Sequence, residues 1–305
     1  MISIDVEDWF HILDSSVTPE IRTWSDLPLR AQASMMKILE MLAETGTKAT
    51  FFWLGWMAER MPQLVRRCAD EGHEIASHGY GHILAYKAGR QAFREDIRKA
   101  KLILEGIVGQ PVQGFRAPGF GITEKASWAF DVIKNVGYEY DTSVFPASRG
   151  HGGLLDAPLG LHFITTESGP LPEVPMSMVE LFDKRFSIFG GGYLRLAPQG
   201  LIRWGIKQLH KQGQPLIIYV HPREVDPDHP RLPLGLVRRF KSYVNLRSTM
   251  PKLNWLCHNY SFFTMRELVA DYVKSADREK LLKKLGNSED KDWFDSVFFL
   301  KGDPS

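Results

Sequence analysis

Two histidines four residues apart, His78 and His82, are the residues whose types and spacing most directly suggest chemistry. A strand-like run over residues 73–77 precedes them, and a helical turn after it would place both side chains on one face. Neutral imidazole is the commonest protein ligand for a divalent transition metal, and a catalytic zinc site usually takes three protein ligands. The third could come from acids near the N-terminus: Asp5, Glu7 and Asp8. Packed or solvated histidines are the alternative for so short a motif.

Three further residues could complete a hydrolytic site around such a metal. A bound metal can polarise a carbonyl and activate water, and an acid that does not bind the metal can accept the proton of that water. Arg116 could pair with this base, His221 could protonate a leaving amine, and Asp141 could orient His221. Together these groups suffice for hydrolysis of an amide. Taken singly, each also has a simpler interpretation as a loop or surface residue.

The composition is that of a globular protein with one large core. Of the 305 residues, 44% are hydrophobic and 24% are charged. The net charge of +2 does not indicate a polyanionic partner, and no basic stripe with interleaved aromatics suggests nucleic acid. Cys68 and Cys257 lack Cys-x-x-Cys spacing, so we expect two buried thiols and no thiolate metal site.

The start of the chain bears on its location. Residues 2–6 already read as a strand, without the basic and apolar segments of a secretory signal. No apolar run reaches the ~20 residues that a membrane-spanning helix needs. With Met1 as the native start, we expect a cytoplasmic protein that has no integral membrane segment. The oligomeric state stays open.

Strands and helices alternate along most of the sequence, which predicts a parallel sheet. Expected strands cover residues 2–6, 49–54, 73–77, 112–116, 138–141, 161–165, 173–176, 216–220 and 261–264. Expected helices cover residues 30–44, 62–70, 90–108, a segment capped by Thr123 that stops at Gly137, residues 198–212, a basic segment near Arg238, and a segment from Arg266. Several strands are apolar throughout, which is typical of burial on both faces.

Seven or eight such units favour a distorted (β/α) barrel, with an open doubly wound sheet as the alternative. The chemically distinctive residues follow the ends of five expected strands: Asp5, His78, Arg116, Asp141 and His221. In barrels, active sites collect at the carboxyl ends of the strands, and this coincidence supports the barrel. We expect one domain over residues 1–272 and a charged helical extension over residues 273–305. The Gly- and Pro-rich residues 146–192 interrupt the rhythm, and Gly190–Gly192 read as a loop that lets backbone approach another group closely.

Five motifs resemble those of the polysaccharide deacetylases, the carbohydrate esterases of family four. They are SIDVED at residues 3–8, SHGYGH at 77–82, RAPGF at 116–120, YDTS at 140–143 and YVHP at 219–222. They occur in the family's order and span roughly residues 1–270. The sequence is also similar to the branch found with bacterial exopolysaccharide gene clusters, through GGGYLR at 190–195. The resemblance implies a distorted (β/α) barrel and a Zn²⁺-type metal, for which Co²⁺, Ni²⁺ or Mn²⁺ could substitute.

The resemblance also implies a role for each matching residue. Asp5 corresponds to the general base, Arg116 to the partner of that base, His221 to the general acid and Asp141 to the residue that tunes the acid. His78 and His82 correspond to metal ligands. The family's adjacent aspartates are interrupted here by Val6, so the third ligand is Asp8 or Glu7. We favour Asp8 because its shorter side chain suits a fixed ligand. The remaining candidates, for substrate binding, are Trp9, His11, Gly119 and Phe120.

The function implied is removal of N-acetyl groups from N-acetylhexosamine units of a bacterial polysaccharide or its precursor. Gly119 stands where the family usually has an aromatic residue. Its N–H can still hold an oxyanion, but the apolar wall must come from Phe120 or elsewhere. Two alternatives remain: hydrolysis of a small amide, such as a cyclic ureide or formamido sugar, and a non-catalytic glycan-binding barrel.

Overall fold

The computed structural model describes residues 1–13, 15–148, 152–182 and 184–286, with side chains to residue 276. Its main sheet has eight strands in the order β10-β1-β2-β3-β4-β5-β7-β6, all parallel except the antiparallel pair β6–β7. The strands are β1 (Ile2–Val6), β2 (Thr50–Trp53), β3 (Glu74–Ser77), β4 (Gly114–Phe115), β5 (Tyr140–Asp141), β6 (His162–Ile164), β7 (Leu171–Glu173) and β10 (Ile218–Val220). A separate hairpin pairs β8 (Val179–Leu181) with β9 (Lys184–Phe186).

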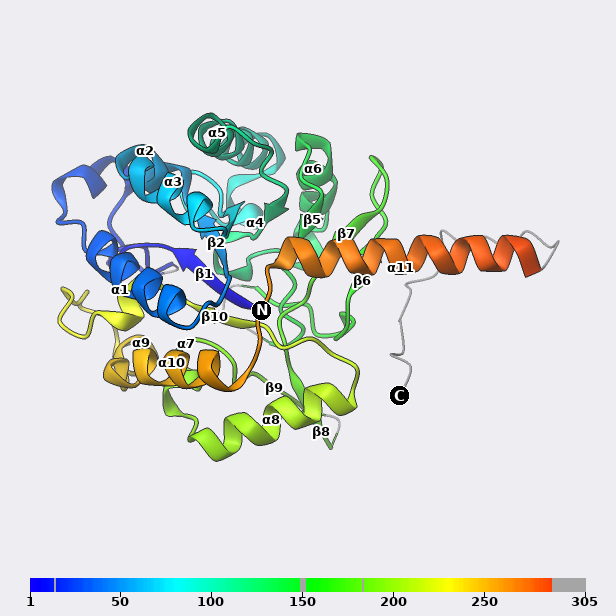
Figure 1. Ribbon diagram of the computed structural model, residues 1–305. Helices are drawn as coiled ribbons and strands as arrows, with labels where there is room; N and C mark the ends of the chain where they lie inside the picture. The colour runs from blue at the N-terminus through cyan, green and yellow to red at the C-terminus, as the bar shows by residue number, and fades with distance from the viewer. Residues whose placement is uncertain (14, 149–151, 183, 287–305) are drawn as a thin grey trace.

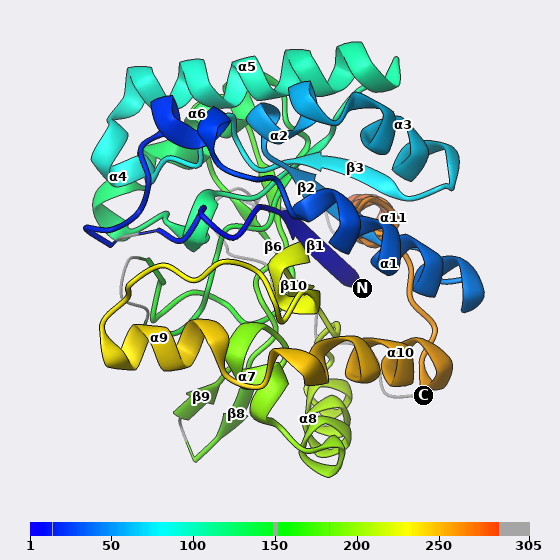
Figure 2. The same ribbon diagram turned by 90° about the vertical axis from the view of Figure 1, so that its left-hand side faces the viewer.

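Helices surround this sheet, as Figures 1 and 2 show. The α-helices are α1 (Ala31–Glu44), α2 (Gly55–Arg60), α3 (Pro62–Asp70), α4 (Ala85–Ala88), α5 (Arg90–Val108), α6 (Trp128–Val136), α7 (Gly191–Leu196), α8 (Gln199–Lys211), α9 (Leu236–Tyr243), α10 (Thr249–Asn259) and α11 (Met265–Gly286). Short 3₁₀ turns are η1 (Ile21–Asp26), η2 (Pro118–Phe120), η3 (Glu124–Ala126), η4 (Pro222–Val225) and η5 (Leu246–Ser248). The expected (β/α) barrel is confirmed as a curled, mostly parallel sheet in a single domain.

The two faces of the sheet are packed by alternating residues of each strand. In β2, Phe51 and Trp53 belong to the larger apolar core together with helical side chains, whereas Phe52 belongs to a second cluster. In β10, Ile218 joins the larger core and Tyr219 the second cluster. This alternation follows from the two-residue period of a strand, and burial on both sides explains why these strands are apolar throughout.

Three sequence expectations are wrong in whole or in part. Residues 261–264 form no strand, and the preceding segment forms helix α10, which the sequence pattern did not reveal. The helix expected from Thr123 is instead a 3₁₀ turn followed by α6, and Thr123 makes no side-chain capping hydrogen bond. Gly190 does approach another group closely, because a Cβ added there would lie 2.0 Å from the Tyr219 ring. The glycine segment is not a loop, however, but the start of helix α7.

Helix α11 continues the barrel domain without a break. Its first turn is attached to the sheet because the Arg266 N–H donates to Glu74 Oε2 at 2.9 Å and the Met265 N–H donates to Thr50 Oγ1 at 2.9 Å. The boundary expected at residue 272 therefore falls inside a helix, and most of that helix projects beyond the sheet (Figure 1). Residues 287–305 of the expected extension lie outside the described part of the chain.

Candidate active site

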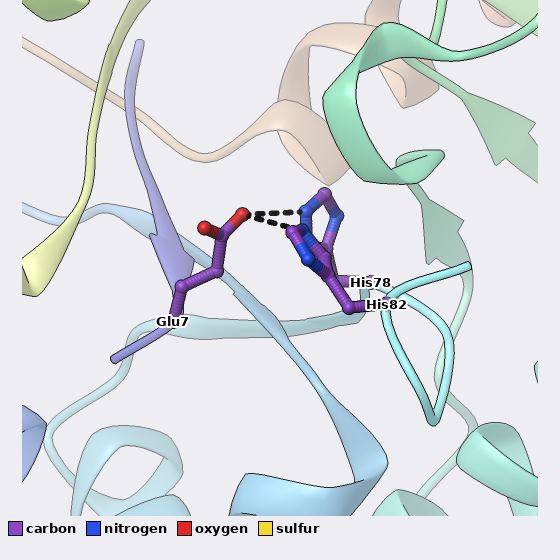
Figure 3. A group of neighbouring side chains, drawn as sticks. All are labelled: Glu7, His78 and His82. Carbon is purple, nitrogen blue, oxygen red and sulfur yellow. Dashed lines mark hydrogen bonds and ion pairs between the residues drawn. The ribbon is translucent and has the colours of Figure 1, made fainter. Parts of the chain in front are cut away.

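Glu7, His78 and His82 form a buried cluster of potential metal ligands (Figure 3). Glu7 Oε1 lies 3.2 Å from His78 Nε2 and 2.9 Å from His82 Nε2. Glu7 follows β1, and the two histidines follow β3, so the parallel sheet brings segments about 70 residues apart in sequence to one edge. Two imidazoles and one carboxylate match the protein ligand set of known catalytic zinc sites.

The surroundings of this cluster fit a metal. His78 Nδ1 lies 2.7 Å from the carbonyl oxygen of Arg116, and donation to that carbonyl leaves Nε2 with its lone pair toward Glu7. Such a second hydrogen bond commonly fixes the tautomer of a metal-binding histidine. Burial opposes ionisation of Glu7, but the charges of His82 and His221 hold its pKa well below 4.5. The carboxylate is therefore in the form that binds a cation.

Asp8 lies on the other side of the backbone, contrary to its expected place among the ligands. Its carboxylate accepts hydrogen bonds from the N–H groups of Trp9, Arg30 and Ala31 at 2.8–2.9 Å. Asp5 and Glu7 both line the cavity described below, whereas the Asp8 carboxylate contacts the start of α1. The structure thus brings the alternative residue, Glu7, to the histidines and uses Asp8 to cap the start of α1.

The loop carrying the histidines is held in an unusual conformation. It is irregular and not the helical turn expected from the spacing, and His82 has a positive φ of 54°. Asp96 of α5 stabilises the loop by accepting the N–H groups of Tyr80 and Gly81, both at 2.8 Å. A positive φ at a non-glycine residue costs free energy, so it persists where neighbouring contacts fix it. Asp96 was not identified from sequence, because nothing in its own helix distinguishes it.

Asp5 and Arg116 form a buried ion pair beside the cluster. Arg116 Nη1 donates to Asp5 Oδ1 at 2.6 Å and to Ser3 Oγ at 2.9 Å. Asp5, Glu7 and His221 also place potential ligand atoms within 4.8 Å of one another. The guanidinium against Asp5 disfavours a second cation there, because it would face an existing positive charge. The expected pairing of Arg116 with the candidate base is therefore present in the structure.

His221 lies at the same place, but its partner differs from the expected one. His221 Nε2 lies 3.7 Å from Glu7 Oε1, and its Nδ1 lies 2.7 Å from Glu224 Oε1. Glu224 is held in turn by Arg195, whose Nε lies 3.1 Å from Glu224 Oε2. Burial alone would lower the pKa of His221, but the Glu7 charge and the Glu224 hydrogen bond outweigh burial and raise it above 6.5. Arg195, with burial opposing, holds the pKa of Glu224 at about 2.

Asp141, the residue expected to tune His221, has other contacts. Its carboxylate accepts hydrogen bonds from the N–H and hydroxyl of Ser143 at 3.0 and 2.7 Å, and it interacts with the buried Glu173. Ser143 Oγ accepts the N–H of Ala117 at 2.7 Å. Asp141 therefore supports the loop after Arg116 and not the histidine. Sequence signals for Glu224 existed: it lies three residues after His221, a spacing that permits contact in a helical turn.

A cavity of about 670 Å³ opens over these groups. Of the four substrate-binding candidates, His11, Gly119 and Phe120 line it, whereas Trp9 does not and donates its indole N–H to the Pro28 carbonyl at 3.0 Å. His11 Nδ1 accepts the Asp8 N–H at 2.8 Å, so its other nitrogen carries the proton. That buried Nε2 has no hydrogen-bond partner among the described residues.

These observations define a (β/α) barrel with a candidate hydrolytic metal site at the carboxyl ends of its strands. Residues 21–140 match the family model of polysaccharide deacetylases, and residues 142–270 match a domain of unknown function, DUF3473. The chain therefore contains a segment, residues 21–140, that matches the polysaccharide deacetylase family. Within the described residues, we find no helix both long and apolar enough to span a bilayer.

Named relatives are similar to part of the chain, and a solved structure is similar in fold. A peptidoglycan-N-acetylglucosamine deacetylase of Bacillus cereus is 34% identical over 118 residues, which are 35% of this chain and 43% of that protein. A chitooligosaccharide deacetylase of Sinorhizobium fredii is 35% identical over 98 residues, 32% of this chain and 43% of the relative. The chain thus matches less than half the length of these relatives. A crystal structure described as a polysaccharide deacetylase from Mycobacterium smegmatis superposes with a TM-score of 0.61 at 19% identity, covering 90% of each chain, and supports the fold.

Proposed function

We propose that this protein is a metal-dependent hydrolase that removes N-acetyl groups from N-acetylhexosamine units of a bacterial polysaccharide or its precursor. One observation carries the proposal: the carboxylate that joins the two histidines also lies beside an acid and a third histidine, so that Asp5, Glu7 and His221 form a second group around the same Glu7. A set of metal-binding side chains flanked by a proton acceptor and a proton donor is suited to amide hydrolysis.

In this proposal Glu7, His78 and His82 hold the metal. Zn²⁺ suits two imidazoles and a carboxylate, and the same ligands accept Co²⁺, Ni²⁺ or Mn²⁺. The bound ion would supply Lewis-acid polarisation of the acetyl carbonyl and of a water molecule. The ligand residues are buried, so their positions are fixed before substrate binds.

Asp5 would accept the proton of the attacking water. Arg116 keeps its carboxylate oriented through the 2.6 Å contact and is itself completely buried. A charge-assisted hydrogen bond of this length fixes one carboxylate oxygen and leaves the other for the proton. Asp5 lines the cavity, whereas Arg116 does not, which separates the reacting group from its support.

His221 would protonate the leaving amine. The Glu224 carboxylate on Nδ1 stabilises the imidazolium and directs Nε2 toward the cavity, which His221 also lines. Gly119 would offer its N–H to the developing oxyanion. The two N–H groups that follow it, those of Phe120 and Gly121, already donate to the carbonyl oxygens of Ala117 and Pro118. Phe120 and Tyr219, with ring centroids 5.2 Å apart, supply the apolar wall.

Acetate release tests this function. The full chain is incubated with N-acetylglucosamine oligomers, peptidoglycan fragments and an N-acetylated exopolysaccharide, with and without a chelator, and the metal is then added back. We expect acetate from at least one glycan, loss with chelator and recovery with Zn²⁺. Release that is unaffected by chelator would exclude the metal role. If the protein releases no acetate from any N-acetylated glycan but hydrolyses a small amide such as a formamido sugar, the alternative function of small-amide hydrolysis would be favoured.

A further inference from the structure

An exposed apolar surface borders the mouth of the catalytic cavity. On α9, the side chains of Leu236, Val237 and Phe240 are 85%, 72% and 58% exposed. Their spacing places them on one face of the helix. Val237 and Phe240 also line the cavity. This apolar face is therefore continuous with the place where a glycan would bind.

Helix α7 extends the same surface. Tyr193 and Leu196 are each more than half exposed and line the cavity as well. We call these five side chains the α7–α9 rim: Tyr193, Leu196, Leu236, Val237 and Phe240. Large contiguous apolar surfaces on a soluble protein mark interaction sites more often than isolated exposed residues do.

The charge around the rim is one-sided. Helix α9 has three basic residues and no aspartate or glutamate, although the whole chain is nearly balanced with 38 basic and 36 acidic residues. The basic residues of α9 are Arg238, Arg239 and Lys241. A positive region of this kind complements an anionic surface.

We propose that the α7–α9 rim docks the catalytic face of the protein on an anionic lipid bilayer. A short helix with Leu, Val and Phe on its apolar face and several basic residues is typical of helices that lie in the membrane interface. The two most exposed residues of the rim, Leu236 and Val237, are aliphatic and offer no ring on which a sugar could stack, which favours lipid over glycan as the occupant. Docking would present the cavity to glycans anchored in that membrane.

Arg195 ties α9 to the catalytic groups. It donates to the carbonyl oxygens of Ser242 and Lys241 at 2.9 and 2.8 Å, at the end of α9, and it pairs with Glu224 at 3.1 Å. The rim is therefore attached to the floor of the site through one buried side chain. A lipid surface that holds α9 would also hold His221 and Glu224 at a fixed distance from the membrane.

Vesicle co-sedimentation tests the docking. The probes are vesicles of phosphatidylglycerol mixed with phosphatidylethanolamine, and vesicles of phosphatidylcholine alone. We expect salt-sensitive binding to the first and little to the second. The double variant Leu236→Asp, Arg239→Glu should bind the anionic vesicles about tenfold more weakly or worse, since it removes an apolar contact and reverses a basic charge. Neither residue lines the cavity, so acetate release from a soluble glycan should be unchanged.

A matched double variant, Leu102→Asp with Arg98→Glu, makes the same changes on exposed residues of α5, across the molecule from α9 (Figure 2). It should bind like the wild type. Equal losses in both double variants, no preference for anionic vesicles, or a rim variant that changes only oligomeric state or glycan binding would each overturn the proposal. Vesicle binding is measured without any turnover. A protein that binds anionic vesicles but releases no acetate would therefore contradict the proposed catalysis and still support the proposed docking.

Discussion

At the scale of single residues, Glu7 organises the site. Its Oε1 lies 3.2, 2.9 and 3.7 Å from the Nε2 atoms of His78, His82 and His221. Glu7 directly follows β1 and lines the cavity together with Asp5, whereas Asp8 contacts the start of α1. Two neighbouring acids thus differ in role: Glu7 is the candidate metal ligand, and Asp8 caps a helix.

Exchanging the two acids for amides separates these roles. Glu7→Gln should lose bound metal and activity together, since it removes the only carboxylate among the three ligand atoms. Asp8→Asn should retain metal but unfold at lower temperature, because a neutral amide accepts three backbone N–H groups less well, a loss of about 1 kcal/mol or more. Metal content after dialysis and the thermal midpoint of both variants are measured. Full metal in Glu7→Gln, or none in Asp8→Asn, would reverse the assignment.

Glu224 rather than Asp141 should control the pH dependence of His221. A carboxylate on Nδ1 stabilises the imidazolium, so Glu224→Gln should lower the pKa of His221, and the general acid would lose its proton at lower pH. The alkaline limb of the kcat profile should therefore move to lower pH, with kcat reduced roughly 10²-fold.

Asp141→Asn is the matched comparison, because this residue contacts Ser143 and not His221. It should leave the alkaline limb in place, whatever its effect on stability. A second check uses His221→Ala, which should lose much more activity on an amide than on an activated ester, whose leaving group needs no proton. A limb that moves only in Asp141→Asn would restore the role expected from the sequence.

At the scale of elements, helix α5 supports the site from outside it. Asp96 fixes the histidine loop through two backbone hydrogen bonds, and Gly79 has no room for a side chain because an added Cβ would lie 2.7 Å from the Asp96 carboxylate. The carboxylate is buried, which raises its pKa, and the N–H donors oppose that rise. The loop geometry therefore depends on a helix that contributes no ligand.

Asp96→Ala should weaken metal binding without touching a ligand. Loss of an outer hydrogen-bond partner typically costs about 10–100-fold in metal affinity, and we expect a loss in this range. Affinity is measured by competition with a chromophoric chelator. The control is Glu95→Ala on the exposed side of the same helix. Similar affinities for Asp96→Ala and wild type would show that the ligands hold the loop by themselves.

Most helices and strands could be predicted, because the periodicity of apolar residues and the Gly or Pro residues at their ends depend only on the local sequence. The helices Pro62–Asp70 and Arg90–Val108 end where the sequence predicts, shortly before Gly72 and at Gly109. Contacts between distant segments could not be predicted in this way. The partner of His221 depends on Arg195, which pairs with Glu224 across 29 positions of sequence that include α8 and β10. Helix α10 was missed because its apolar period is weak. Its packing against α1 and α7 involves segments distant in sequence and cannot be inferred from its own residues.

At the scale of the whole molecule, a pair of buried acids adds a pH dependence to folding. Asp141 ends β5, Glu173 ends β7, and both are completely buried. Glu173 Oε1 accepts the Val144 N–H at 2.9 Å, which ties these two strands to the loop that follows them. The pKa of Glu173 is raised well above 4.5, first because burial disfavours the charged form and then because the Asp141 carboxylate repels a second charge. The pair therefore retains a proton in the folded state.

This retained proton predicts how stability changes with pH. Above about pH 4.5 the unfolded chain releases the proton of Glu173, whereas the folded chain keeps it up to the raised pKa. The folded state then binds more protons than the unfolded state, so this group's contribution to the free energy of unfolding falls as the pH rises. Glu173→Gln keeps a neutral group that can still accept the Val144 N–H, and it removes the titration. Urea unfolding of both proteins, saturated with metal, from pH 5 to pH 8 should show the variant gaining stability relative to wild type with increasing pH. Parallel stability curves would mean that Glu173 is ionised in the folded protein and that Arg116, which lowers its pKa, outweighs burial.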